Sequence, residues 1–173
     1  DLNNSSKTTH LSPLYSSRYD NGYGFGAVYG VNRISSLGFD KDKLIVGCAG
    51  YGKAYNVNGT GNPYPGLGVS GTLTKISGYD GSLASGTVHG SVINQLIKSG
   101  EYTQYTEKDN NGNIVGSYLY NSSKKIFVTY DSKEAVMAKY EYAKANGLGM
   151  MCWAYTEDTS DTVINAIYEA KNK

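Results

Sequence analysis

Residues 43–53 decide the fold, and they read Lys43-Leu44-Ile45-Val46-Gly47-Cys48-Ala49-Gly50-Tyr51-Gly52-Lys53. Up to Ala49 they form a near-continuous apolar run with β-branched members, which is typical of a strand buried in a parallel sheet. Upstream, apolar residues recur at every third position from Val28 to Leu37, which predicts an amphipathic helix that Gly38 ends. A helix, a short loop and a buried strand make one α-to-β step of an α/β fold.

A second α/β segment lies near the end of the sequence. Residues 126–130 predict a strand, and Asp131 and Glu134 have the spacing of a capping box that opens a helix running to Asn146. Residues 148–155 predict another buried parallel strand, and residues 162–171 predict a last amphipathic helix.

The part between these segments has a different pattern. Residues 54–126 hold short alternating segments, a helix near residues 88–98, and two strands (102–107 and 114–120) around a strong turn. This pattern predicts an inserted α+β block, so the chain divides into 1–53, 54–126 and 127–173, with residues 1–26 as a long loop. Two parallel strands cannot form a closed barrel, so their free edges predict either missing strands or self-association.

Composition narrows the function. The chain has 173 residues and a net charge of +1 without any block of like charge, so neither a nucleic-acid nor a membrane partner is expected. Seventeen tyrosines and 22 glycines accompany many hydroxyl and amide side chains, which suits neutral polar ligands such as sugars. An ordinary secreted domain with long loops has a similar composition. The first residue is Asp1 and no secretory signal is present, which suggests a piece of something longer.

The cysteines and histidines predict no metal, cofactor or catalytic triad. Cys48 and Cys152 are too few for a disulfide scaffold and are better interpreted as buried free thiols. Neither has a metal-ligand spacing, and neither His10 nor His89 has a nucleophile at a recognisable spacing.

Four segments, taken together, resemble the family 18 glycoside hydrolases, the chitinases. Residues 43–53 resemble the seventh barrel strand with its Tyr-Gly-Arg motif, and residues 148–153 resemble the eighth, whose Trp closes the floor of the sugar site. Residues 129–132 are similar to the Tyr-Asp segment that follows the insertion domain, and residues 9–15 to the loop after the sixth strand. The resemblance implies an α/β fold made of the last strands and helices of a (β/α)8 TIM barrel, with a chitinase insertion domain over 54–126, in a secreted enzyme.

Two features depart from the family pattern. Lys53 stands where the family has Arg, so a planar two-point donor becomes a point charge. The catalytic run Asp-x-x-Asp-x-Asp-x-Glu does not occur in these 173 residues, and the acidic cluster 157–161 is better interpreted as a helix start. The resemblance therefore implies that the half with the catalytic strand is missing, and that this chain alone does not hydrolyse chitin.

Site residues follow from the resemblance. In this family the N-acetyl group of the substrate is itself the nucleophile, and an enzyme Glu is the proton donor. Trp153 is the predicted apolar plate for the sugar, although a Trp on a strand also commonly fills a core. Tyr51 and Lys53 fall at the catalytic face of the barrel, where Lys53 either binds sugar or is a solvated charge. Tyr155 and Glu157 follow the eighth strand and are predicted to line the groove.

One catalytic assignment falls at the start of the chain. Asp1 resembles the end of the Met-x-Tyr-Asp motif, and the resemblance implies that it assists the acetamido group. Three functions stay open on the sequence. The chain is part of a chitinase that binds chitin or chitooligosaccharides beside a missing amino-terminal barrel half, an inactive chitooligosaccharide-binding module, or a structural remnant.

Overall fold

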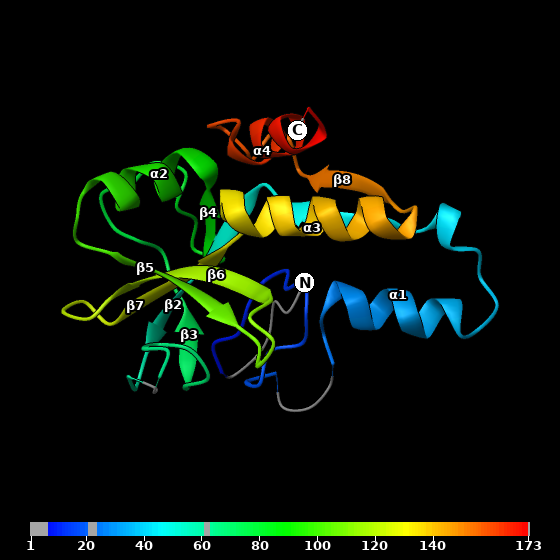
Figure 1. Cartoon of the computed structure of the whole chain (residues 1–173). Helices are drawn as coiled ribbons and strands as arrows, with labels where there is room; N and C mark the ends of the chain where they lie inside the picture. The colour runs from blue at the N-terminus through cyan, green and yellow to red at the C-terminus, as the bar shows by residue number, and fades with distance from the viewer. Residues whose placement is uncertain (1–6, 21–23, 61–62, 173) are drawn as a thin grey trace.

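The computed structural model describes residues 7–20, 24–60 and 63–172, and it contains two sheets (Figure 1). The smaller sheet pairs β1 (Ile45–Ala49) with β8 (Gly149–Trp153) in parallel. The larger sheet is antiparallel and has six strands in the order β3-β2-β7-β6-β5, with β4 also paired to β2. Its strands are β2 (Tyr51–Val57), β3 (Gly71–Leu73), β4 (Thr87–His89), β5 (Thr103–Lys108), β6 (Ile114–Asn121) and β7 (Ile126–Tyr130).

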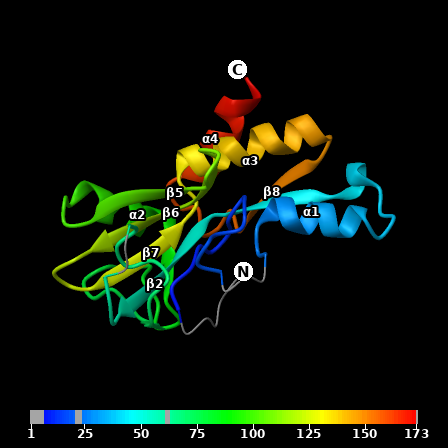
Figure 2. The same ribbon diagram turned by 60° about the horizontal axis from the view of Figure 1, so that its bottom comes forward.

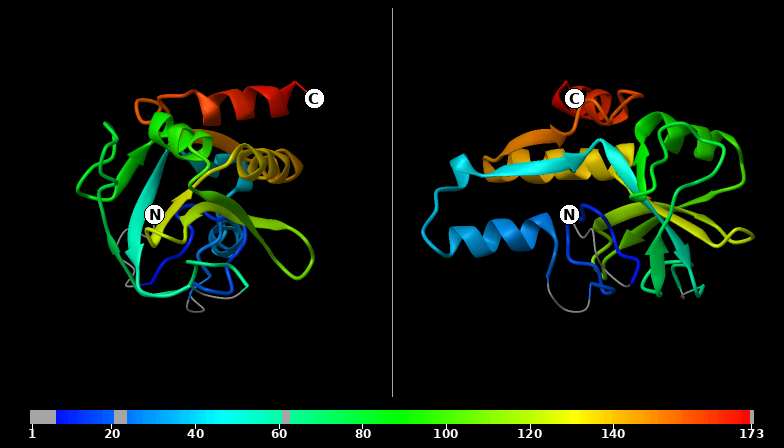
Figure 3. Two further views of the ribbon diagram at one scale, coloured as in Figure 1. Left: turned by 90° about the vertical axis from the view of Figure 1, so that its left-hand side faces the viewer. Right: turned by 180° about the vertical axis from the view of Figure 1, so that it is seen from behind.

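The helices have the predicted positions. They are α1 (Ala27–Ser35), α2 (Gly90–Lys98), α3 (Lys133–Asn146) and α4 (Thr162–Lys171), and a short 3-10 turn (Lys41–Lys43) lies in the predicted loop before β1. Gly147 ends α3 in the left-handed conformation with φ of 67°, which a residue without a Cβ adopts at little cost. Figures 2 and 3 show α3 and α4 against the parallel sheet, with α1 apart from them. An apolar groove of about 280 Å³ lies between α1 and β1.

The parallel sheet is covered on one face, which corrects the prediction of two fully buried strands. Cys48, Met150 and Cys152 pack against Val163 of α4 and further apolar side chains of α3 and α4. On the alternate positions Ile45, Met151 and Trp153 are exposed. No described element covers this second face, so β1 holds both buried and exposed residues and β8 alternates between half-buried and exposed ones, instead of both being buried throughout.

The six-stranded sheet has a core on each face. On one face α2 packs over Ala54, Val88, Leu119 and neighbouring residues. The other face is rich in aromatic rings, among them Tyr118 stacked on Tyr105 at 5.1 Å between centroids. This second core explains part of the high tyrosine content, because the rings fill the space between the sheet and the loops beneath it.

The amino-terminal segment crosses this second face and contains no helix in its described part. Thr8 exchanges backbone hydrogen bonds with the loop at 68–69, Leu11 N donates to Thr129 Oγ1 at 2.9 Å, and Leu14 N donates to Val115 O at 2.9 Å. The predicted long loop is therefore fixed over residues 8–14 by hydrogen bonds to three separate segments, the loop at 68–69, β7 and β6.

Two local predictions need revision. The residue that caps α3 is Ser132, whose Oγ accepts from Ala135 N at 3.2 Å, whereas Asp131 is engaged elsewhere. In addition, β2 crosses the predicted division at residues 53/54 and β7 lies across the one at 126/127. The division of the chain into domains stays a prediction.

Candidate functional site

The predicted site residues converge where β1 and β8 end. Ala49 lies opposite Trp153 in the parallel register, and Gly50 N donates to Trp153 O at 2.9 Å. Because β2 starts one residue later, Tyr51 follows directly from this point. The strands thus bring Tyr51 and Trp153, which are far apart in sequence, to the same end of the parallel sheet.

Trp153 and Tyr155 are the two exposed aromatic residues of this end. Each is 63% exposed, and Trp153 belongs to the strand positions that face away from α3 and α4. The prediction placed Trp153 on a buried strand, and this is wrong for the described part of the chain, since nothing there covers that face. An exposed indole gives a flat apolar surface to a ligand.

Tyr51 and Lys53 are buried, and they lie within electrostatic range of Glu157. Lys53 Nζ donates to Thr87 Oγ1 of β4 at 2.8 Å and lies 5.7 Å from the centre of the Tyr51 ring. Burial lowers the pKa of Lys53, an effect that Glu157 opposes. Burial also raises the pKa of Tyr51, and the carboxylates of Glu157 and Asp131 add to it. The structure therefore brings Tyr51, Lys53 and Glu157 together, and the alternative of a solvated Lys53 is wrong.

The turn after β8 leads into α4 through a buried carboxylate. Both oxygens of Asp158 accept hydrogen bonds from the first backbone N–H groups of α4, those of Thr162, Val163 and Ile164, at 3.0–3.1 Å. The sequence interpretation of the acidic cluster as a helix start is confirmed, with Asp158 as the residue that stabilises the positive end of the helix.

A buried ion pair behind the strand ends was not predicted. Lys139 Nζ lies 2.6 Å from Asp131 Oδ2, and the two side chains are 1% and 3% exposed. The same carboxylate oxygen accepts from Ala49 N at 2.8 Å and from Ser12 Oγ at 3.2 Å. The sequence does contain an indication of this ion pair. Lys139 is spaced from Val136 and Ala143 so that it lies on the apolar face of α3, where a lysine needs a buried partner.

A second buried polar group joins the amino-terminal loop to β5. His10 Nε2 lies 2.9 Å from Glu107 Oε2, and Ser17 Oγ donates to the same oxygen at 2.7 Å. Arg18 Nε is 3.5 Å from the other oxygen of Glu107. A side chain at Gly116 would lie 2.6 Å from the His10 ring, so only glycine fits beside it. This arrangement binds the loop to the sheet, consistent with a packing role for His10.

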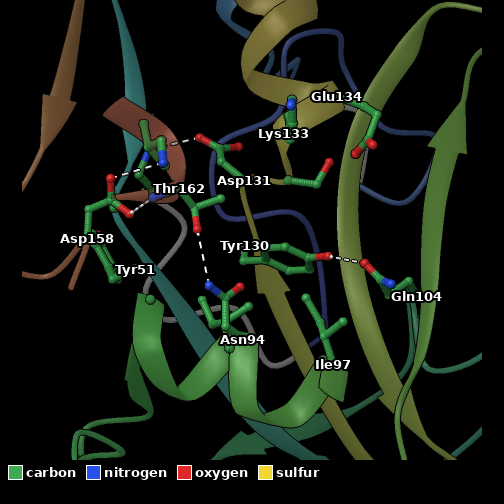
Figure 4. A pocket seen from close by; sticks show the side chains of 16 residues that line it. Tyr51, Asn94, Ile97, Gln104, Tyr130, Asp131, Lys133, Glu134, Asp158 and Thr162 are labelled. Carbon is green, nitrogen blue, oxygen red and sulfur yellow. Dashed lines mark hydrogen bonds between the residues drawn. The ribbon is translucent and has the colours of Figure 1, made fainter. Parts of the chain in front are cut away.

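A pocket of about 170 Å³ opens on the side of the strand ends that faces α2, α3 and α4 (Figure 4). Asn94 Nδ2 donates to Thr162 Oγ1 at 3.4 Å and Tyr130 OH donates to Gln104 Oε1 at 3.1 Å across its wall. Of the predicted site residues that the structure describes, only Tyr51 lines it. The pocket is therefore separate from the exposed face of Trp153.

The remaining predicted groups are placed as follows. Asp1 lies outside the described residues. Cys48 and Cys152 are free thiols opposite each other in the β1–β8 register; Cys48 is buried as predicted, whereas Cys152 is only half-buried. In the described part of the chain, no group of three or more His, Cys, Asp or Glu side chains is placed to hold a metal ion. Among the same residues no helix has the length and apolar character needed to cross a membrane.

Known sequences resemble this chain over most of its length. Chitinase ChiA of Flavobacterium johnsoniae is 26% identical over 197 residues, covering 93% of this chain and 12% of that protein. Chitinase A1 of Niallia circulans is 31% identical over 146 residues, covering 83% of this chain and 20% of that protein. The chain thus spans a small part of the length of these relatives.

Solved structures show the same fold. Catalytic domain 2 of the Group II chitinase of Ostrinia furnacalis, in complex with (NAG)5, gives a TM-score of 0.80 at 24% identity, covering 97% of this chain and 45% of that one. The class V chitinase of Nicotiana tobaccum in complex with NAG4 gives 0.70 at 20% identity, covering 95% and 44%. The profile of the glycosyl hydrolases family 18 matches residues 1–158, and this chain belongs to that family.

Proposed function

We propose that this chain forms one wall of the sugar site of a secreted chitinase that hydrolyses β-1,4-linked N-acetylglucosamine polymers. The observation that carries the proposal is the convergence of an exposed Trp153 with Tyr51, Lys53 and Glu157 at one end of the parallel strands. Membership of family 18 and the fold shared with sugar-bound chitinases support the substrate class. In this proposal β1 and β8 are the last two strands of a (β/α)8 barrel, and the six-stranded block is its insertion domain.

The chemistry assigned to these residues is binding and orientation. In a substrate-assisted retaining reaction the acetamido oxygen attacks the anomeric carbon of its own sugar, so the enzyme has to hold that group against a rigid surface. The indole of Trp153 supplies the surface and excludes water from one side of the pyranose ring. Lys53 is held by Thr87 and Tyr51, so its ammonium is an oriented donor for a sugar oxygen. Tyr155 and Glu157 extend the wall on the same side.

The proton donor lies outside this wall in the proposal. General acid catalysis contributes about 10²–10⁴-fold, and none of the 173 residues falls in the family's catalytic run, so we expect no hydrolysis by this chain alone. The missing half of the barrel is then the partner that supplies the acid, and Asp1 would assist the acetamido group beside it. The absent catalytic run equally favours the alternative of an inactive chitooligosaccharide-binding module.

A fluorescence titration tests the sugar site directly. Trp153 is the sole tryptophan of the sequence, so tryptophan emission reports on this position alone. Chitohexaose should change the emission and saturate, while cellohexaose, which has the same linkage without acetamido groups, should bind at least about tenfold more weakly. Trp153→Phe keeps a smaller ring and should weaken chitohexaose binding by calorimetry. No saturable signal with chitohexaose would refute the proposed wall.

A further inference from the structure

The turn that carries Tyr155 and Glu157 is packed against Gly50, at the point where β1 passes into β2. A Cβ added at Gly50 would lie 2.7 Å from Ala154 O and 3.0 Å from Asp158 Cβ. The first distance is shorter than real contacts allow and involves backbone, which cannot rotate away, and the second is tighter than most real contacts. The chain therefore tolerates only glycine here, and the turn lies directly on the strand junction.

The same turn is fixed internally through its backbone. Glu157 N and Asp158 N donate to Ala154 O at 2.9 and 3.2 Å, and Asp161 N donates to Asp158 O at 2.8 Å. These bonds close residues 154–158 into one compact unit that directly follows Trp153. Movement of any part of this unit therefore moves Tyr155 and Glu157.

Asp158 connects this unit to α4, and its two neighbours in the sequence connect it to α2. Its carboxylate accepts the hydrogen bonds from the three first N–H groups of α4, and it is 2% exposed. The neighbouring Glu157 O accepts from Gly90 N at 2.9 Å, and Thr159 Oγ1 accepts from Ser91 N at 2.9 Å, so the start of α2 holds the same turn from the other side.

We infer that Asp158 is a positioning residue for the sugar site, a role that rests on the proposed function. It fixes the turn 154–158 against α4, α2 and Gly50, and so it sets the positions of Glu157, which acts electrostatically on Lys53, and of Tyr155. The carboxylate acts through the turn and has no contact with sugar. A charged acceptor is suited to this task because a carboxylate has lone pairs for several N–H donors at once.

The test separates positioning from a general loss of stability. Asp158→Ala removes the acceptor from α4, and Ser132→Ala removes the side-chain cap of α3, so both variants lose a helix-capping contact. Asp158→Ala should weaken chitohexaose binding on the order of tenfold, the change expected when a fixed turn loses a capping contact. Ser132→Ala should lower the urea midpoint while leaving the affinity within about twofold of the wild type. Asp158→Asn keeps one of the two side-chain oxygens and should therefore restore part of the affinity.

A second pair of variants perturbs the turn from the strand side. Gly50→Ala should weaken binding like Asp158→Ala, whereas Gly30→Ala, at a glycine with open space around it, should not. Equal affinity losses in Asp158→Ala and Ser132→Ala, or unchanged affinity in Asp158→Ala and Gly50→Ala, would overturn the inference.

The proposed function and the positioning role fail in different ways. If wild-type protein binds no chitohexaose, the proposed function fails. Amide hydrogen exchange then tests separately whether Asp158 fixes the turn 154–158. Asp158→Ala must speed exchange at Glu157 N–H and Asp158 N–H, and Ser132→Ala must not; equal exchange at these amides in both variants would refute it.

Discussion

Replacing Lys139 by methionine tests how much the buried ion pair behind the strand ends contributes to stability. Methionine has a similar length and keeps the apolar packing of the lysine stem, so the change mainly removes the ammonium. Asp131 then keeps two hydrogen bonds, from Ala49 N and Ser12 Oγ, but stays buried as a charge without its counter-ion. Removing one partner of a buried pair typically costs about 3–5 kcal/mol.

The structure offers a matched control for this variant. Lys124 Nζ lies 2.6 Å from Glu101 Oε2, the same separation as in the buried pair, but the two side chains are 54% and 50% exposed. Exposed pairs contribute about 0–1 kcal/mol because water screens them. Lys124→Met should therefore have little effect, although the distance between the charges is the same.

Urea unfolding followed by circular dichroism measures both variants. With a slope of about 2 kcal/mol per molar urea, Lys139→Met should lower the midpoint by roughly 2 M, against less than about 0.5 M for Lys124→Met. Adding Asp131→Asn to Lys139→Met removes the unpaired charge and should recover part of the loss. A midpoint shift for Lys139→Met no larger than that of Lys124→Met would refute the reasoning.

Two further outcomes are expected. Burial raises the pKa of the Cys48 thiol from 9.0 to about 12 and that of Tyr102 from 10.0 to about 12, so the folded state holds protons that the unfolded state releases. Their contribution to stability is complete below about pH 9 and should be lost as the pH rises from 9 toward 12; a denaturation midpoint that stays level between pH 9 and pH 11 would contradict this. The uncovered face of β1 and β8, with Ile45, Met151 and Trp153 exposed, should drive self-association, and Met151→Lys should shift the chain toward monomer in light scattering; a wild-type monomer at all concentrations would count against it.

Sequence patterns predicted the four α-helices and the strands β1, β5, β6, β7 and β8 because their periodicity is local, whereas β2, β3 and β4 were predicted only as short alternating segments. The apolar spacing upstream of Gly38, the stop at Gly147 and the strand before Asp131 are each encoded within a few residues. Exposure is different, because it depends on what packs against each face. The apolar runs of β1 and β8 look like fully buried strands, yet half of their residues are exposed in the described structure.

The buried polar contacts could not be predicted for a related reason. His10 and Glu107 are far apart in sequence, and no local pattern links them. Asp131 has the spacing of a helix cap, but Ser132 caps the helix and the carboxylate of Asp131 is used by Lys139 and Ala49 N instead. Of the site, the family resemblance selected Tyr51, Lys53 and Glu157, which the structure brings together, but it gave no sign of the support from Thr87.

The pairing of β2 with β7 lowers the entropic cost of pairing β1 with β8. Residues 50–148 separate these two strands, and closing a loop of that length is entropically unfavourable. However, Lys53 lies opposite Thr129, so the two ends of the segment between them lie side by side. Once that segment is folded, its ends are already neighbours, and the two parallel strands meet across an effective tether of a few residues plus α3. The six-stranded sheet thus stands between β1 and β8 in the sequence without lengthening the path that the chain has to close to pair these two strands.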